Sequence, residues 1–368
     1  MDYRQPFHLP PNRVWRTYLG GMLLDRIEGK DSPRDSHLPE DWVGSSTRAV
    51  NPGNRPTDEG IGKAVGADGC EVAMDAFFAA APEQALGPEH VAEFGDNPQL
   101  LVKLLDSSVR LHLQAHPTAD WAQRHLGAHN GKTEAWWVLD ARLETASVLL
   151  GFQRPPEPRE WRRIIDSQDL EAMLACFDPI PVSPGDVLLV PSAVPHAVGA
   201  GQLLVEVQEP TDFVVRCEYA RNGCELPESA RAMGLGVDRV VDMFDYTAYP
   251  ADMVKRTLGP KHQIPVDSRC GREEVLLGPP QTDRFEVRRI TAEDSLPLAV
   301  DGRFSVLIVL EGAGEIVGDG LSLSVSRWSR VLLPAALESV TVNGRLKVAR
   351  CLPPRAGRAA GHPGIPTC

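Results

Sequence analysis

Two histidines, a glutamine and a glutamate are spaced so that they could bind one metal ion. Gln114 and His116 are two residues apart. Lys132 and Glu134 have the same spacing, and a later P-S-A-V-P-H motif ends at His196. Because successive side chains of a β-strand point to opposite faces, residues at this spacing share a face if the segments are neighbouring strands. Nitrogen and oxygen ligands without a thiolate favour zinc in an open catalytic site over a closed structural one.

The local spacing leaves a second interpretation open, because histidines on half-buried strands often bind nothing. Three other histidines are competing candidates for the site. His112 would share the face of Gln114, where it could simply be a pocket wall. His125 and His129 lie in a polar segment. The stretches later in the chain favour the metal-binding interpretation.

Four stretches, taken in order, resemble the type I mannose-6-phosphate isomerases, a family of zinc-dependent cupin enzymes. The matching residues are the Q-A-H-P run from Gln114 to Pro117, the K-x-E of Lys132 and Glu134, His196, and the D-x-V-V-R run from Asp212 to Arg216. Milder matches are Val14, Trp15, Glu40, Trp42 and the run from Pro98 to Asp106. The resemblance covers roughly the first two thirds of the chain.

The resemblance implies a metal site, a reaction and a fold. Its zinc ligands would be Gln114, His116, Glu134 and His196. The implied activity is that of an aldose–ketose isomerase that interconverts mannose 6-phosphate and fructose 6-phosphate through a cis-enediol, with a small sugar or sugar phosphate as its partner. The implied fold is mainly β, with two cupin (jelly-roll) domains and short helical insertions. Many short strands bounded by Gly and Pro turns favour the same architecture.

Four charged residues are candidates for the chemistry that this reaction needs. Arg216 is permanently cationic and would stabilise the enediolate, and Asp212, four residues earlier on an expected strand, would face the same pocket. Lys132 and Glu206 are equal candidates for the base, although they could also form an ion pair that only holds the site. Gln208 shares the face of Glu206 and is a candidate for contact with the substrate.

One departure from the family concerns the substrate. Where the family usually has a serine near the phosphate end of the pocket, this chain has His112. A charged histidine can bind phosphate, but the same side chain can fill the space that a phosphate needs. We expect mannose 6-phosphate as the substrate, with another or unphosphorylated sugar such as mannose as the alternative. A third alternative, a non-catalytic sugar-binding or regulatory cupin, would not need so many catalytic residue types.

The composition argues against several classes of protein. The chain has 368 residues, of which 42% are hydrophobic and 24% charged, as in an ordinary globular protein. Its net charge of −12 offers no basic face to nucleic acid. We find no segment typical of a membrane span or signal peptide, and the seven scattered cysteines contain no C-x-x-C pair. We therefore expect a cytoplasmic protein with reduced thiols and no membrane or nucleic-acid partner, whose oligomeric state is not predicted.

The hydrophobic pattern predicts where the elements lie. Residues 71–94 show interrupted helical spacing, which predicts two short helices after a loop over 44–70. Residues 100–113 form an apolar run that predicts a buried strand entering the metal site. Residues 136–150 predict a strand, a turn and a strand, and residues 160–176 predict a helical insertion.

A repeat predicts a second copy of the same fold. Residues 183–196 align without gaps with residues 326–339, and Ser339 takes the place of His196. We therefore expect the second copy to bind no metal. The expected division is a catalytic domain over residues 1–235 with a helical insertion near 157–177, a connecting segment over 236–265, a second cupin-like domain over 266–352 and a mobile tail over 353–368.

Overall fold

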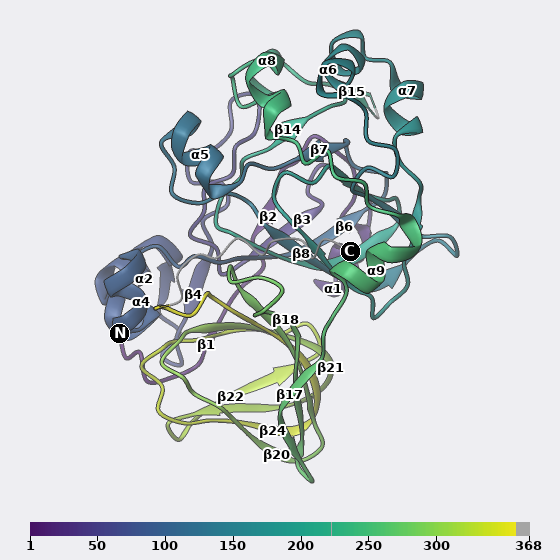
Figure 1. Cartoon of the computed structure of the whole chain (residues 1–368). Helices are drawn as coiled ribbons and strands as arrows, with labels where there is room; N and C mark the ends of the chain where they lie inside the picture. Colours follow the sequence, from purple (N-terminus) through teal and green to yellow (C-terminus); the bar gives the residue numbers. More distant parts are fainter. Residues whose placement is uncertain (222, 358–368) are drawn as a thin grey trace.

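The chain folds mainly into β-strands, which confirms the fold class expected from the sequence. A computed structural model describes residues 1–221 and 223–357. Figure 1 shows two β-rich bodies, with most of the purple-to-teal part of the chain in the upper body and the yellow-green part in the lower body. The predicted metal ligands all belong to the upper body, so its sheets are the ones that position the site.

Two sheets build the upper body among the described residues. The first has the strand order β11 (Val187–Val190), β8 (Glu134–Ala141), β13 (Gln202–Gln208), β6 (Leu101–Ser107), β3 (Glu40–Val43) and β2 (Arg13–Val14). The second has the order β10 (Ile180–Pro181), β9 (Ser147–Leu150), β12 (His196–Val198), β7 (Gln114–Ala115) and β14 (Val215–Arg216). A separate pair joins β15 (Ala220–Arg221) and β16 (Cys224–Glu225).

The apolar run over residues 100–113 is not a single strand. β6 ends at Ser107 and the next strand, β7, begins at Gln114 in the other sheet. β6 is buried along its whole length, which explains why most of its residues are apolar. The apolar character continues because Leu111 and Leu113 are also buried while the chain crosses between the sheets. Burial of this crossing, and not strand continuation, is the reason for the pattern.

Short helices cover the outside of the sheets. They are α1 (Met22–Ile27), α2 (Met74–Ala80), α3 (Pro82–Leu86), α4 (Pro88–Phe94), α5 (Ala119–Leu126), α6 (Pro158–Ser167), α7 (Leu170–Ala175), α8 (Val237–Val240) and α9 (Ala251–Leu258), with the 3₁₀ helices η1 (Glu228–Ala230) and η2 (Val241–Met243). Residues 71–94 hold three helices rather than two, because Pro82 and Pro88 each start a helix at a position where no N–H is needed. The predicted insertion forms α6 and α7, which lie with α8 at the top of Figure 1.

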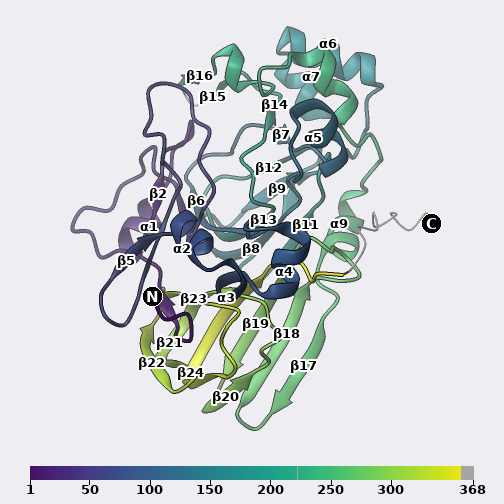
Figure 2. The ribbon, with the colours of Figure 1, turned by 90° about the vertical axis from the view of Figure 1, so that its left-hand side faces the viewer.

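The lower body is formed by one large sheet that also takes in strands from the N-terminal part. Among the described residues its order is β17 (Gln263–Ser268), β18 (Gly271–Leu277), β19 (Glu286–Ala292), β24 (Val340–Leu352), β21 (Ser305–Gly318), β23 (Arg330–Leu333), β1 (Phe7–His8), β4 (Lys63–Val65) and β5 (Glu71–Ala73), with β20 (Ser295–Leu298) on β24 and β22 (Leu321–Ser326) on β21. Phe7 lies opposite Leu332, and Figure 2 shows the N-terminus beside β23. The sheet thus crosses the expected domain boundary, and the division into domains stays a prediction.

The sequence repeat has a counterpart in the strand order. In the upper body β11 lies next to β8, which is followed by β13 and β6. In the lower body the aligned β23 lies next to β21, which is followed by β24 and β19. Gly185 and Trp328, at equivalent positions of the repeat, have φ angles of 98° and 73°. Glycine adopts this left-handed conformation freely, whereas Trp328 adopts it at a cost, so the turn itself has been kept in both copies.

The chain after β24 stays in contact with the lower body over its next few residues. The carbonyl of Pro353 accepts a hydrogen bond from Arg303, and Arg355 forms ion pairs with Glu286 and Asp301. The rest of the expected tail, residues 358–368, lies outside the described residues. In the described part of the chain, no helix is both long and apolar enough to cross a membrane.

Candidate active site

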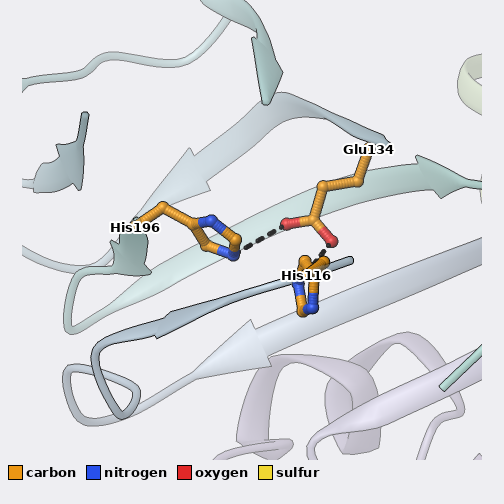
Figure 3. A group of neighbouring side chains, drawn as sticks. All are labelled: His116, Glu134 and His196. Atoms are coloured by element: carbon orange, nitrogen blue, oxygen red, sulfur yellow. Dashed lines mark ion pairs between the residues drawn. The ribbon is translucent and has the colours of Figure 1, made fainter. Parts of the chain in front are cut away.

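Three buried side chains in the upper body converge so that they could hold a metal ion. Nε2 of His116 lies 3.2 Å from Oε2 of Glu134, and Nε2 of His196 lies 3.4 Å from Oε1 of the same carboxylate. One ligand atom from each of the three lies within 4.8 Å of the others. Figure 3 shows the two imidazole rings turned toward the carboxylate between them. Two imidazoles and a carboxylate are a donor set that suits a divalent transition metal.

The ligands come from both sheets, which corrects the expectation that they lie on neighbouring strands. Gln114 on β7 pairs with His196 on β12, and His116 follows directly after β7. Glu134 is the first residue of β8, which belongs to the other sheet. The predicted ligands therefore meet between two sheets. The two-residue spacing predicts that Gln114 and His116 lie on the same side of the chain. The carboxylate of Glu134 reaches them because the two sheets pack against each other.

Backbone carbonyls hold both imidazoles in the tautomer that metal binding needs. Nδ1 of His116 lies 2.8 Å from the carbonyl oxygen of Phe213, and Nδ1 of His196 lies 2.9 Å from that of Val194. A carbonyl can only accept, so each Nδ1 carries the proton and each Nε2 presents a lone pair to the cluster. Burial lowers the pKa of His196, and burial followed by the charge of Lys132 lowers the pKa of His116 to about 3. Both rings are therefore neutral, and they fit a metal ion.

Two neighbouring side chains complete the surroundings of the cluster. The side-chain amide of Gln114 lies 3.4 Å from Nε2 of His196, so a half-turn of the amide would present its oxygen to the same point. Trp136 donates from Nε1 to Oε1 of Glu134 at 3.0 Å and so orients the carboxylate. The predicted fourth ligand is thus at the cluster, while Trp136 supports it from the core.

Lys132 contacts the same atoms that a metal ion would use. Its ammonium group donates to Nε2 of His116 at 2.8 Å and to Oε2 of Glu134. Burial alone would raise the pKa of Glu134, but the positive charge of Lys132 outweighs it and holds that pKa well below its usual value. The carboxylate is therefore ionised, and the ammonium group and a metal ion would compete for it.

A cavity adjoins the cluster and brings together all four residues predicted for catalysis. Its lining comprises Arg16, Thr17, Tyr18, Glu40, Lys103, Leu105, Leu111, His112, Gln114, His116, Lys132, Glu206, Asp212, Val214 and Arg216. Asp212 and Arg216 both line it although β14 covers only Val215–Arg216. The two share the cavity because of the path of the chain after β13, and not because one strand carries both.

A chain of buried ion pairs forms much of the cavity wall. The guanidinium of Arg16 lies 2.7 Å from Asp212 and 3.0 Å from Glu40. Lys103 lies 2.8 Å from Glu206 and 3.6 Å from Glu40. Burial would lower the pKa of Lys103, but the two carboxylates raise it, so the ammonium stays charged. Each of these cations is thus neutralised locally, as buried charges require.

Arg216 differs from the other cavity cations. Its Nη1 donates to the carbonyl oxygen of Ala230 at 2.7 Å, and no carboxylate lies within ion-pair distance of it among the described residues. Burial lowers the pKa of Arg216 to about 10, despite the opposing charge of Asp212. The guanidinium is therefore still charged at neutral pH and is available to a negative group in the cavity.

The remaining predicted residues have distinct surroundings. Glu206 accepts from Lys103 through Oε1, and burial raises its pKa although Lys103 opposes this. Gln208 is fully buried and donates to the carbonyls of Glu209 and Thr211, which supports the turn after β13. Its predicted contact with the substrate stays a prediction. His112 lines the cavity and donates from Nδ1 to the carbonyl of Glu218 at 2.9 Å.

Sequence reasoning missed Arg16 and Tyr18 and named Glu40 and Lys103 only as matches to the family. Tyr18 donates its hydroxyl to Glu40, which in turn contacts Arg16 and Lys103. The sequence contains a signal for Glu40 and Lys103, because both are charged residues inside fully buried strands. A buried charge needs a partner, so such residues are candidates for a site. Arg16 has no such pattern, because its partner Asp212 is 196 residues away in the chain.

The fold and the cluster define the class of this protein as a mainly β protein with a buried histidine–glutamate–histidine group that can hold a metal ion. No protein-family model matches the sequence. The curated protein named "Probable mannose-6-phosphate isomerase GmuF", from Bacillus subtilis, is 28% identical over 245 residues, covering 67% of this chain and 72% of that protein. The mannose-6-phosphate isomerase of Streptococcus mutans is 26% identical over 286 residues, covering 76% of this chain and 84% of that protein.

Solved structures agree with these sequence similarities. The crystal structure of the mannose 6-phosphate isomerase from Bacillus subtilis matches with a TM-score of 0.74 over 94% of this chain and 99% of that one, at 21% identity. This structural likeness shows the shared fold, and the curated relatives add the sequence relationship. The chain is therefore similar, in sequence and in fold, to mannose-6-phosphate isomerases.

Proposed function

We propose that this protein interconverts mannose 6-phosphate and fructose 6-phosphate through a cis-enediol intermediate. The observation that carries the proposal is the buried cluster of His116, Glu134 and His196 beside a cavity that also holds the unpaired guanidinium of Arg216. An aldose–ketose isomerase needs groups that hold the sugar oxygens and a cation for the enediolate charge. The names of the two curated relatives support the choice of substrate.

The proposal includes zinc as the bound ion. Two neutral imidazoles, one carboxylate and the nearby amide of Gln114 are ligands that zinc accepts in catalytic sites. When bound, zinc would supply a Lewis acid that polarises the hydroxyl and carbonyl oxygens of the sugar. The carbonyl contacts at both Nδ1 atoms support this assignment, because such contacts usually orient histidines that bind zinc.

The base is the group that moves a proton between two adjacent sugar carbons. Glu206 is the stronger candidate, because burial raises its pKa and its Oε2 forms no hydrogen bond with the described residues. Lys103 would hold Oε1 and so orient this carboxylate. Lys132 is the alternative base, but its ammonium group is already engaged by His116 and Glu134.

Arg216 would stabilise the negative charge that develops on the sugar oxygens. Its guanidinium is buried beside the cavity and carries no competing carboxylate among the described residues. A charge held in this way contributes most when the negative charge appears, which is in the transition state. Asp212 would act by positioning Arg16, with which it forms two hydrogen bonds of 2.9 and 2.7 Å.

An unphosphorylated sugar such as mannose is the second candidate substrate. The observation that favours it is the neutralisation of the other cavity cations: Arg16, Lys103 and Lys132 each contact a carboxylate. Arg216 is then the only cavity cation among the described residues that no carboxylate neutralises. Phosphate sites usually combine several donors. A single cation without a carboxylate partner therefore argues either for a phosphate group that extends out of the cavity or for an unphosphorylated sugar.

A coupled assay of zinc-loaded protein with mannose 6-phosphate and mannose side by side tests the proposal. We expect a higher kcat/KM for mannose 6-phosphate, and we expect Glu206→Gln to lose nearly all turnover of both sugars. A preference for mannose would overturn the substrate and leave the isomerase in place. Absence of turnover on both sugars, with zinc bound, would overturn the isomerase itself.

A further inference from the structure

His112 has one ring nitrogen whose hydrogen bonding is left open. Its side chain lines the cavity and only 2% of the residue is exposed. Nδ1 lies 2.9 Å from the carbonyl oxygen of Glu218. Nε2 is buried and has no hydrogen-bond partner among the described residues. Buried polar atoms nearly always find a partner, so an unpaired one in a cavity wall points to a ligand.

The partner of Nδ1 decides what Nε2 can bind. A carbonyl oxygen only accepts hydrogen bonds, so Nδ1 carries the ring proton and Nε2 is left with a lone pair. Nε2 therefore accepts and does not donate. A hydroxyl group can donate to it, whereas the oxygens of a phosphate dianion are themselves acceptors and would face it lone pair to lone pair.

Glu218 is held in place, so the ring of His112 has little freedom to reverse this arrangement. The carboxylate of Glu218 lies 2.7 Å from Arg110 through Oε1 and 3.1 Å from Arg221 through Oε2. Oε1 also accepts from the backbone N–H of Leu113 at 3.3 Å, one residue after His112. These contacts fix the segment that carries the carbonyl opposite Nδ1.

We propose that Nε2 of His112 accepts a hydrogen bond from one uncharged hydroxyl group of the sugar, which makes His112 a specificity-determining residue of this cavity. The inference rests on the proposed function for the class of ligand, a sugar or sugar phosphate. It assigns this wall of the cavity to the polyol part of the ligand and places any phosphate elsewhere. His112 then contributes to recognition equally for phosphorylated and unphosphorylated sugars.

Two substitutions separate the two nitrogens of the ring. His112→Asn keeps an amide near the position of Nδ1, where it can still donate to the Glu218 carbonyl, but has no atom at the position of Nε2. His112→Gln can place an amide oxygen near the position of Nε2. We expect His112→Asn to weaken binding about tenfold, the usual effect of one lost neutral hydrogen bond, and His112→Gln to recover part of it.

The ligands for this test are mannitol and its monophosphate, which cannot be isomerised, together with analogues that lack one hydroxyl group each. Binding is measured by calorimetry with the zinc-loaded protein, so the result does not depend on turnover. We expect His112→Asn to weaken both parent ligands alike and to leave one deoxy analogue unaffected. A loss confined to the monophosphate would mean that His112 contacts phosphate, and an unchanged affinity for both parents would mean that it contacts neither; each result overturns the proposal.

The unmodified protein provides a second test that does not depend on the folding of a variant. Long-range ¹H–¹⁵N NMR reports which nitrogen of a histidine carries the proton, and the His112 signals are assigned by their loss in His112→Gln. We expect the Nδ1–H tautomer, and a shift of the Nε2 resonance when mannitol is added. An Nε2–H tautomer would overturn the proposal. If the protein binds these ligands but isomerises neither mannose sugar, the proposed function fails while the role of His112 stands.

Discussion

One backbone carbonyl assigns the proton on each imidazole of the cluster. The carbonyls of Phe213 and Val194 take the Nδ1 protons of His116 and His196, so each Nε2 is ready to bind before any ion arrives. Neither carbonyl could be identified from the sequence, because the residues that matter contribute backbone atoms. The ligand types themselves could be predicted, because the sequence directly gives which residues carry imidazole and carboxylate side chains.

Removing one imidazole tests the metal site. We expect the purified protein to contain about one zinc per chain. His196→Ala should lose most of this zinc, because the alanine side chain has no lone pair to donate to the metal. Metal content by mass spectrometry is the measurement. His129→Ala, at an exposed histidine, is the matched control and should keep its metal. Full zinc occupancy in His196→Ala would remove the assignment of the cluster.

Arg216 should matter more for turnover than for binding. In Arg216→Ala we expect kcat to fall by about 10²–10³ while KM changes little, because the charge that Arg216 stabilises exists mainly in the transition state. Arg216→Lys keeps the charge but loses the planar fork of the guanidinium. Its kcat should therefore lie between those of the unmodified protein and Arg216→Ala. Steady-state kinetics on mannose 6-phosphate measure the split. A raised KM with unchanged kcat would make Arg216 a substrate anchor instead.

Strand pattern explains which elements the sequence could predict. β8 and β9 follow the strand, turn and strand expected over residues 136–150, because apolar runs on either side of a polar turn mark buried strands. A strand at Gln114 could be predicted from the residue spacing, but its pairing with β12 and β14 could not, since these strands lie far away in the chain. For the same reason, local spacing could not predict that Glu134 lies in a different sheet from Gln114 and His196.

The pair of Lys103 and Glu206 links two neighbouring strands of the first sheet. Lys103 on β6 lies directly opposite Glu206 on β13, and both side chains are buried. Each charge lies in a run of apolar residues and therefore depends on the other for its stability. The pair is both a structural joint and, in the proposed mechanism, the means by which the base is oriented.

Breaking this pair should destabilise the protein strongly. We expect Lys103→Met to lower the free energy of unfolding by about 3–5 kcal/mol, because it leaves the carboxylate of Glu206 buried without a counter-charge. The double variant with Glu206→Gln should regain much of that loss, since both charges are then absent. Urea unfolding of the two variants compares them. If Lys103→Met and the double variant are equally stable, Glu206 is neutral in the folded protein.

At the scale of the whole molecule, the two bodies use the same strand order for different purposes. The lower body has Ser339 where the upper one has His196. Its buried sheet carries an ion-pair network, in which Glu273 contacts Arg288 and Arg350 at 3.2 and 3.0 Å. Glu286 joins this network through Arg288 and through Arg303 at 2.9 Å. We expect this body to contribute stability and packing, with the chemistry confined to the upper body.

The network of the lower body should make stability depend on pH. Burial alone would raise the pKa of Glu286, but the charges of Arg303 and Arg288 hold it at about 2, below its usual 4.5. A lowered folded-state pKa stabilises the protein above about pH 4.5 and loses that effect as the pH falls toward 2, in total about 3 kcal/mol. We expect the drop in stability between about pH 5 and pH 3 to be smaller in Glu286→Gln.

Chemical unfolding at a series of pH values measures this effect. Glu338→Gln, at an exposed glutamate that pairs with Arg4 on the surface, is the control and should follow the unmodified protein. If Glu286→Gln also follows the unmodified protein over this pH range, the network does not supply the proposed acid sensitivity.

Isomerisation in heavy water tests the central claim most directly. Zinc-loaded protein is incubated with mannose 6-phosphate in D₂O, and the sugars are followed by ¹H NMR. The proposed enediol route transfers a proton through a protein group, so we predict that fructose 6-phosphate forms with deuterium from the solvent at C1. Deuterium at C1 would show that the proton passes through an exchangeable protein group, whereas no product from zinc-bound protein would contradict the isomerase.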